Sequence, residues 1–177
     1  MKEKNPGLMR LVLAGLMLAL CMVLPFLTGQ IPQIGSMLLP MHLPVLLAGY
    51  LCGPVWAAGV GFVAPFLRFA LFGMPHIYPV GMSMAVEMAV YGLVVGLLWA
   101  KGKHSVGGVY LSLVPAMIAG RLAWGAVQFV LAGLSGSAFP FSAFLSGAVL
   151  SAVPGIVLQL VLIPILVEAL RRAGVIK

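Results

Sequence analysis

The chain has 177 residues, of which 63% are hydrophobic and 7% are charged, and its mean hydropathy is +1.19. A soluble domain of this length does not cover so apolar a core with so few charges, which excludes a soluble enzyme or binding domain. The composition predicts an all-α membrane protein, a single domain over residues 1–177 with room for about six spans of roughly 20 residues each.

The basic residues are distributed unevenly along this chain. Eight of the ten lie at three places, and these are Lys2, Lys4, Arg10, Lys101, Lys103, Arg171, Arg172 and Lys177. Positively charged loops stay in the cytoplasm, so we expect both termini and the loop at 101–107 to be cytoplasmic, which requires an even number of spans. The three expected external loops carry no lysine or arginine. The net charge of +7 therefore indicates membrane orientation, not nucleic-acid binding.

The first span is expected at about 8–28. Small residues at Ala14, Gly15 and Ala19 include a small-xxx-small pair, Gly15 to Ala19, which lets another helix approach closely. The partner is either another helix of this chain or a separate subunit, and the pattern alone does not choose between them.

The stretch from Gly29 to Gly53 is apolar but is interrupted by Pro32, Pro40 and Pro44. Proline removes a backbone donor and breaks a helix interior, so a regular span does not accommodate all three. We expect a non-helical loop over 29–40 that dips into the outer membrane face, followed by a short span at about 40–52.

The remaining spans are expected at about 55–72, 80–100, 108–131 and 143–170. Pro154 and Pro164 predict a kink in the last of them. Cys21 and Cys52 fall near opposite ends of adjacent spans, so a disulfide is not expected, and no spacing of metal ligands occurs. We expect neither a metal nor a cofactor.

Ionisable residues deep in apolar spans are candidates for function, because an unpaired charge in a bilayer is costly. The candidates are Arg68, Glu87 and Arg121. Trp124 and Gln128 follow Arg121 at i+3 and i+7, so the three share one helix face and suit the lining of a small-molecule site. His42 and the expected outer-loop residues add further candidates: His76, Tyr78, Phe139 and Phe141.

Each of these candidates also has a structural interpretation. Glu87 and Arg121 can form a buried ion pair that locks two spans together, and Arg68 can extend to the outer surface. His42 can serve as a hydrogen-bonding residue at the start of a helix, and Tyr78 can belong to the interfacial aromatic belt. Two arginines against one glutamate would leave a surplus positive charge, which favours a ligand bearing a carboxylate.

Motifs of known catalytic chemistry are missing. The sequence has no Walker A phosphate-binding loop, so this chain does not bind ATP in that way, and it lacks the H-E-x-x-H and G-x-S-x-G motifs. An intramembrane enzyme that uses Glu87 with His42 or His76 remains an alternative, as does a helical scaffold without a ligand. We expect a binding protein that draws energy from partner subunits.

Three segments carry a family resemblance: LPFLTGQIPQIGSMLLPMHLPVLLAGYLCGP, APFLRFALFGMPHIYP and MSMAVEMAVYG. In these segments, in size and in expected topology, the chain resembles the substrate-binding (S) components of energy-coupling factor (ECF) vitamin transporters. The resemblance implies a subunit in the plasma membrane of a prokaryote that binds a vitamin or vitamin precursor outside the cell. It also implies a transmembrane coupling subunit and two cytoplasmic ATPase subunits as partners, which drive uptake.

The resemblance also implies positions for the sites. Ligand-binding residues would come from the outer loops and outer halves of the later spans, here around 33–42, 68–78, Glu87, 121–128 and 139–141. The family's docking surface uses an Ala-x-x-x-Ala motif on the first span, and this chain has Gly15 where the first alanine would stand, with Ala19 following. The resemblance leaves pantothenate, folates, riboflavin and the pyrimidine precursors of thiamine as candidate ligands.

Overall fold

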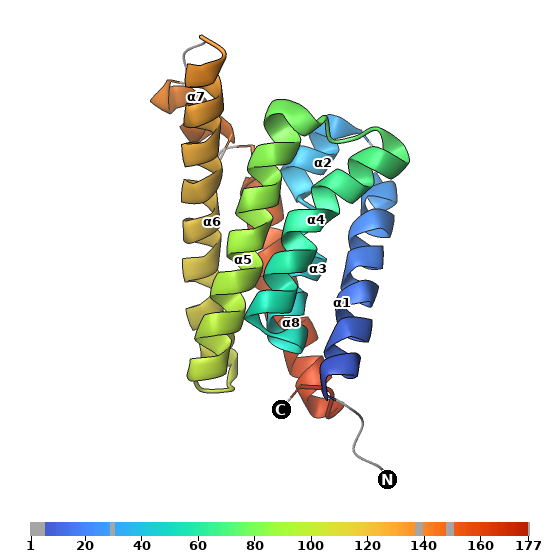
Figure 1. The fold of residues 1–177 in the computed structure, drawn as a ribbon. Helices are drawn as coiled ribbons and strands as arrows, with labels where there is room; N and C mark the ends of the chain where they lie inside the picture. The colour runs from blue at the N-terminus through green and yellow to red at the C-terminus, as the bar shows by residue number, and fades with distance from the viewer. Residues whose placement is uncertain (1–5, 29–30, 137–139, 148–150, 177) are drawn as a thin grey trace.

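Helices account for nearly all of the regular structure of this chain. The computed structural model describes residues 6–28, 31–136, 140–147 and 151–176, and within these ranges there is no β-strand (Figure 1). The elements in chain order are α1 Pro6–Val23, η1 Leu24–Thr28, α2 Pro32–Leu38, α3 His42–Cys52, α4 Pro54–Phe72, η2 Ile77–Gly81, α5 Met82–Lys101, α6 Val106–Leu134, α7 Phe141–Leu145 and α8 Val153–Arg172.

Five helical segments in the described ranges are long and apolar enough to cross a membrane: 7–27, 54–72, 77–101, 106–134 and 153–172. The chain is therefore an all-α, multi-pass membrane protein. The predicted second span corresponds to α3, which has only 11 residues and a length of roughly 16 Å, about half of a hydrocarbon core. Six spans and the cytoplasmic placement of the termini stay predictions.

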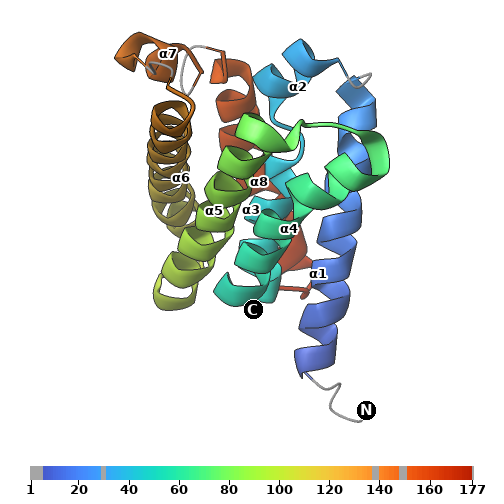
Figure 2. The same cartoon turned by 45° about the horizontal axis from the view of Figure 1, so that its top comes forward.

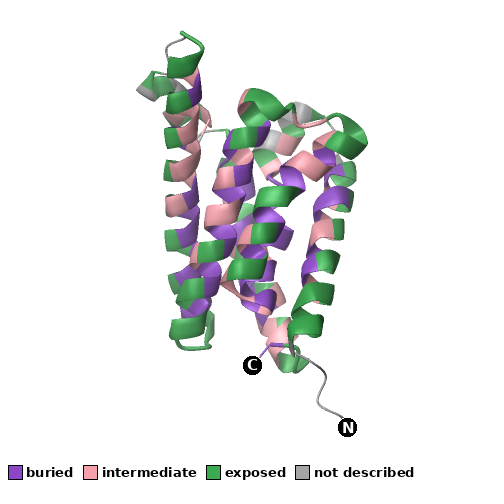
Figure 3. Cartoon of the chain, in the orientation of Figure 1, coloured by how far each residue is buried: buried purple, intermediate pink, exposed green. Residues whose placement is uncertain are grey.

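The short helix α3 lies inside the bundle. It packs against α1, α4, α5 and α8, and most of its residues are buried on all sides. Figures 1 and 2 show α5 between α4 and α6, with α3 and α8 behind, and Figure 3 shows the buried positions on the faces that the helices turn inward. A helix that is apolar all round is typical of such an interior position.

The prediction of a non-helical loop over 29–40 was wrong for residues 32–38, which form α2. Residues 29–30 lie outside the described ranges. Pro32 is the first residue of α2 and Pro44 lies in the first turn of α3, where backbone N–H groups have no partner within the helix in any case. The prolines thus cost no helical hydrogen bonds, and only Pro40 falls between the two helices.

The prediction of one kinked helix over 143–170 was also wrong. Residues 141–145 form α7, and α8 begins at Val153. Pro154 lies in the first turn of α8, so it marks the start of this helix and does not kink it, whereas Pro164 lies inside α8. Cys21 and Cys52 are both buried and free, as expected.

The helix ends that carry basic residues lie at the same end of the bundle in the described part of the chain. The start of α1, the turn between α5 and α6 and the end of α8 lie at one end of the bundle, opposite α2, η2 and α7 (Figure 1). At that end Arg171 and Arg172 pair with Glu168, at 2.8 and 3.0 Å. Lys2, Lys4 and Lys177 lie outside the described residues, and the side of the membrane on which the basic clusters lie stays a prediction.

Helices α4 and α5 approach each other closely along glycines. A Cβ atom added to Gly61 would lie 2.4 Å from the carbonyl oxygen of Met88, and one added to Gly92 would lie 2.6 Å from the backbone of Ala57. Only glycine allows this backbone approach, as is common between membrane helices. The close contact fixes the height and rotation of α5, which carries Glu87.

Candidate functional site

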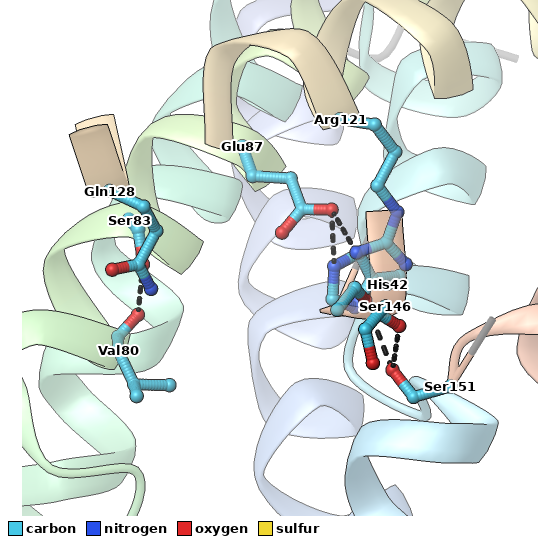
Figure 4. Close-up of polar contacts among 9 residues, drawn as sticks. His42, Val80, Ser83, Glu87, Arg121, Gln128, Ser146 and Ser151 are labelled. Atoms are coloured by element: carbon cyan, nitrogen blue, oxygen red, sulfur yellow. Dashed lines mark hydrogen bonds and ion pairs between the residues drawn. The ribbon is translucent and has the colours of Figure 1, made fainter. Parts of the chain in front are cut away.

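Three polar side chains from three helices meet in the interior of the bundle (Figure 4). Arg121 Nη1 on α6 lies 2.9 Å from Glu87 Oε1 on α5, and His42 Nε2 at the start of α3 lies 3.6 Å from the same oxygen. His42 and Glu87 are each 1% exposed and Arg121 is 12% exposed. We call these three residues the buried polar cluster.

Local packing explains why the cluster forms. Gly120 on α6 lies against the ring of Tyr91 and the backbone of Glu87, where a Cβ atom would clash. This close approach of α6 to α5 brings the neighbouring Arg121 to the carboxylate. The ring of Tyr91 in turn contacts that of His42 edge to face, with centroids 5.4 Å apart. The ion pair is thus held by three helices.

Several buried polar atoms in this region make no hydrogen bond within the described part of the chain. They are Arg121 Nε and Nη2, His42 Nδ1 and Nε2, Glu87 Oε1, the Tyr91 hydroxyl oxygen and both amide atoms of Gln159. Gln159 on α8 is fully buried. Buried polar atoms are nearly always hydrogen-bonded, so a group of unsatisfied ones makes this region a candidate binding site.

A cavity opens beside Arg121 between α6 and α8. Its volume is about 300 Å³. The lining is apolar apart from Tyr91 and Arg121, and the other lining residues are Val114, Met117, Ile118, Leu122, Ile156 and Leu160. An apolar cavity with a few polar groups is typical of small-molecule sites, and this volume is at the low end of their range.

The other residues predicted on the face of Arg121 make contacts within the protein. Gln128 Nε2 donates to the hydroxyl of Ser83 on α5 at 3.2 Å (Figure 4). The ring of Trp124 packs against that of Phe144 of α7, with centroids 6.3 Å apart. These contacts join α6 to α5 and to α7 on the side of the buried polar cluster that faces α2, η2 and α7.

The predicted outer-loop residues are separate from the cluster. The Tyr78 hydroxyl donates to the carbonyl of Leu131 at 2.9 Å and also bonds Ser135, so it ties η2 to the end of α6. His76 is exposed and precedes η2. Phe139 lies outside the described residues, and the side chain of Phe141 is not described.

Arg68 points away from Glu87. Its Nη1 donates to the carbonyl of Met22 on α1 at 2.8 Å, and its guanidinium lies over the rings of Phe26 and Phe72, 5.7 and 5.1 Å from their centroids. At 4% exposure it does not extend to the surface. The structure therefore brings only one of the two arginines to the carboxylate.

The predicted docking residues divide between two faces of α1. Ala14 is buried against the other helices, whereas Gly15 and Ala19 are exposed, and no atom lies within 4 Å of a Cβ added to Gly15. Exposed apolar side chains flank the two, and these are Leu8, Val12, Leu16 and Val23. The outer face of α1 is thus an apolar surface with a small-residue strip.

Sequence reasoning did not select Gln159 or Tyr91 as site residues. A signal existed for Gln159, which is a lone amide in a strongly apolar helix, and polar residues in membrane helices usually face the bundle interior. For Tyr91 no such signal existed, because tyrosine is also common at membrane interfaces.

Comparison with protein families gives one match. The family model for the substrate-specific component of ECF transporters matches residues 9–169. The chain belongs to this family. Comparisons with curated proteins and with solved structures found no match. The chain is therefore a substrate-specific membrane component of an ECF transporter, and its role is in transport.

Proposed function

We propose that this S component binds a water-soluble vitamin or vitamin precursor on the outer side of a prokaryotic plasma membrane. The binding site is the buried polar cluster of His42, Glu87 and Arg121 with the adjoining cavity. The observation that carries this proposal is the set of unsatisfied buried polar atoms beside an apolar cavity. Trp124, Gln128, Tyr78 and His76 belong to the outer part of the route to this site.

The proposed transport cycle needs partner subunits. A transmembrane coupling subunit and two cytoplasmic ATPase subunits would supply the energy, since the sequence has no phosphate-binding loop. The termini would lie in the cytoplasm, and α2 with α3 would together form the second of six passes. Arg68 would serve to hold α4 against α1, and not to contact the ligand.

Native mass spectrometry tests ligand binding. The protein, expressed in rich medium and released gently from detergent, is expected to carry a discrete small molecule that Arg121→Lys loses. Lysine keeps a positive charge near Glu87 but lacks the planar, forked donors of arginine. Arg68→Lys is the matched control and is expected to retain the molecule. A clean unliganded mass that no vitamin raises would contradict the proposal.

The outer face of α1 is the proposed docking surface for the coupling subunit. Gly15→Leu is expected to reduce co-purification with that subunit at least several-fold, because it fills the strip through which helices approach. The control is Gly59→Leu on α4, a second exposed glycine with no atom within 4 Å of an added Cβ. Equal co-purification of the two variants would place the docking surface elsewhere.

A further inference from the structure

The guanidinium of Arg121 pairs with Glu87 through one nitrogen, and its other two nitrogens have no hydrogen-bond partner among the described residues. Its Nη1 faces Glu87 at 2.9 Å. Its Nε and Nη2 are buried and make no hydrogen bond to any described residue. These two nitrogens lie on the same edge and direct their N–H groups in parallel, so they can bind two adjacent acceptor atoms or the two lone pairs of one carbonyl oxygen.

The charge of the site is already balanced. Glu87 compensates Arg121, so the ion pair carries no net charge. Arg68 adds nothing, because it is turned toward Met22. The surplus positive charge that the sequence suggested is therefore absent from this site.

The other elements packed around α3 supply no further charge to the site. On α1, Cys21 directs its thiol to the carbonyl of Met41, the residue before α3. Helix α5 presents Tyr91 beside His42 and Glu87, and the buried polar side chain of α8 in the described chain is the uncharged Gln159. A bound carboxylate would have no countercharge here, and burial of an unpaired charge is strongly unfavourable.

Gln159 supplies the complementary part of the site. It is flanked on α8 by Ile156 and Leu160, which line the cavity beside Arg121 and Tyr91. Both its amide oxygen and its amide nitrogen are buried and make no hydrogen bond in the described chain. An amide in this state pairs with a group that has a donor next to an acceptor, and the apolar cavity walls accommodate a flat ring.

We infer that the ligand is an uncharged planar heterocycle of the cyclic-amide class, with a ring carbonyl oxygen whose two lone pairs accept from Arg121 Nε and Nη2. This inference rests on the proposed function and names the ligand class of the same site. A ring N–H donor and a further acceptor on the ring pair with the amide of Gln159. The site has no surplus positive charge to attract an anion, so it favours a ligand that is itself uncharged.

The test uses three matched pairs of probes, each a neutral ring and its carboxylate: 2-pyridone and 6-hydroxypicolinate, uracil and orotate, and pterin and pterin-6-carboxylate. Binding to the purified full-length protein is measured by titration calorimetry in two buffers that differ in ionisation enthalpy. In at least one pair the neutral ring is expected to bind at least tenfold more tightly than its carboxylate, with no net proton uptake.

Two variants test the assigned contacts. Arg121→Lys removes the free edge, and Gln159→Leu removes the amide, and each is expected to weaken the neutral probe about tenfold or more, because the ring is left with unpaired polar atoms. Gln159→Leu is expected to fold at least as stably as the native chain, since it removes an unsatisfied buried amide. Arg68→Lys is the control and is expected to leave the affinity unchanged.

The outcomes separate this inference from the proposed function. If a carboxylate binds better than its neutral partner, or binding takes up a proton, the ligand class is wrong and the proposed function stands. If no probe binds at millimolar concentration, the molecule retained in native mass spectrometry decides: a cyclic amide supports the inference and any other class overturns it. If no molecule is retained either, the proposed function fails, and the inference with it.

Discussion

Replacing Arg121 with glutamine is expected to lower the free energy of unfolding by about 3–5 kcal/mol, the usual cost when one partner of a buried ion pair is removed. Glu87, which is 1% exposed in the native chain, would lose its arginine partner and keep the His42 ring at 3.6 Å and the nearby Tyr91. Thermal or denaturant unfolding in a mild detergent measures the change. This effect is among the largest that we expect from a single substitution in the described chain.

The double variant Arg121→Gln with Glu87→Gln provides the control. It removes both charges and leaves two neutral amides of similar size, so a large part of the lost stability is expected to return. If the single variant were as stable as the double variant, the ion pair would not be a stabilising element of the bundle. Ligand binding is expected to be lost in both variants. The double variant would thus regain stability without regaining binding, which separates the two roles of Arg121.

Gly92→Ala is the second change with a large expected effect. The new methyl group would lie 2.6 Å from the backbone of Ala57, which cannot move away as a flexible side chain can. Such overpacking typically costs about 1–3 kcal/mol, and a backbone contact lies at the upper end. Because α5 would shift away from α4, retention of the bound molecule is expected to fall as well, as measured by native mass spectrometry.

Gly59→Ala on α4 is the matched control for this prediction. No atom lies within 4 Å of its added Cβ, and alanine favours helix by roughly 0.5–1 kcal/mol over glycine. The control is therefore expected to be neutral or slightly stabilising in the same unfolding assay. A loss of stability equal to that of Gly92→Ala would mean that the close packing of α4 on α5 is not the cause.

Much of the membrane architecture follows from the sequence alone. Apolar composition, basic clusters at three places and small-residue strips are properties of single segments, so they are readable without knowledge of how the helices pack. The limits of the helices were less predictable around proline. Pro32 and Pro154 each start a helix, and a proline in the first turn is hard to distinguish in sequence from one that breaks a helix.

The sequence by itself determined that this protein is an all-α membrane protein and that Arg68, Glu87 and Arg121 are ionisable groups deep in its apolar helices, because the cost of a charge in an apolar helix depends on that helix alone. Only the tertiary structure decided which charges meet. His42 joins Glu87 and Arg121, Arg68 turns to Met22, and Gln159 has no hydrogen-bond partner among the described residues. These pairings depend on the rotation and separation of helices, which close contacts at Gly61, Gly92 and Gly120 set.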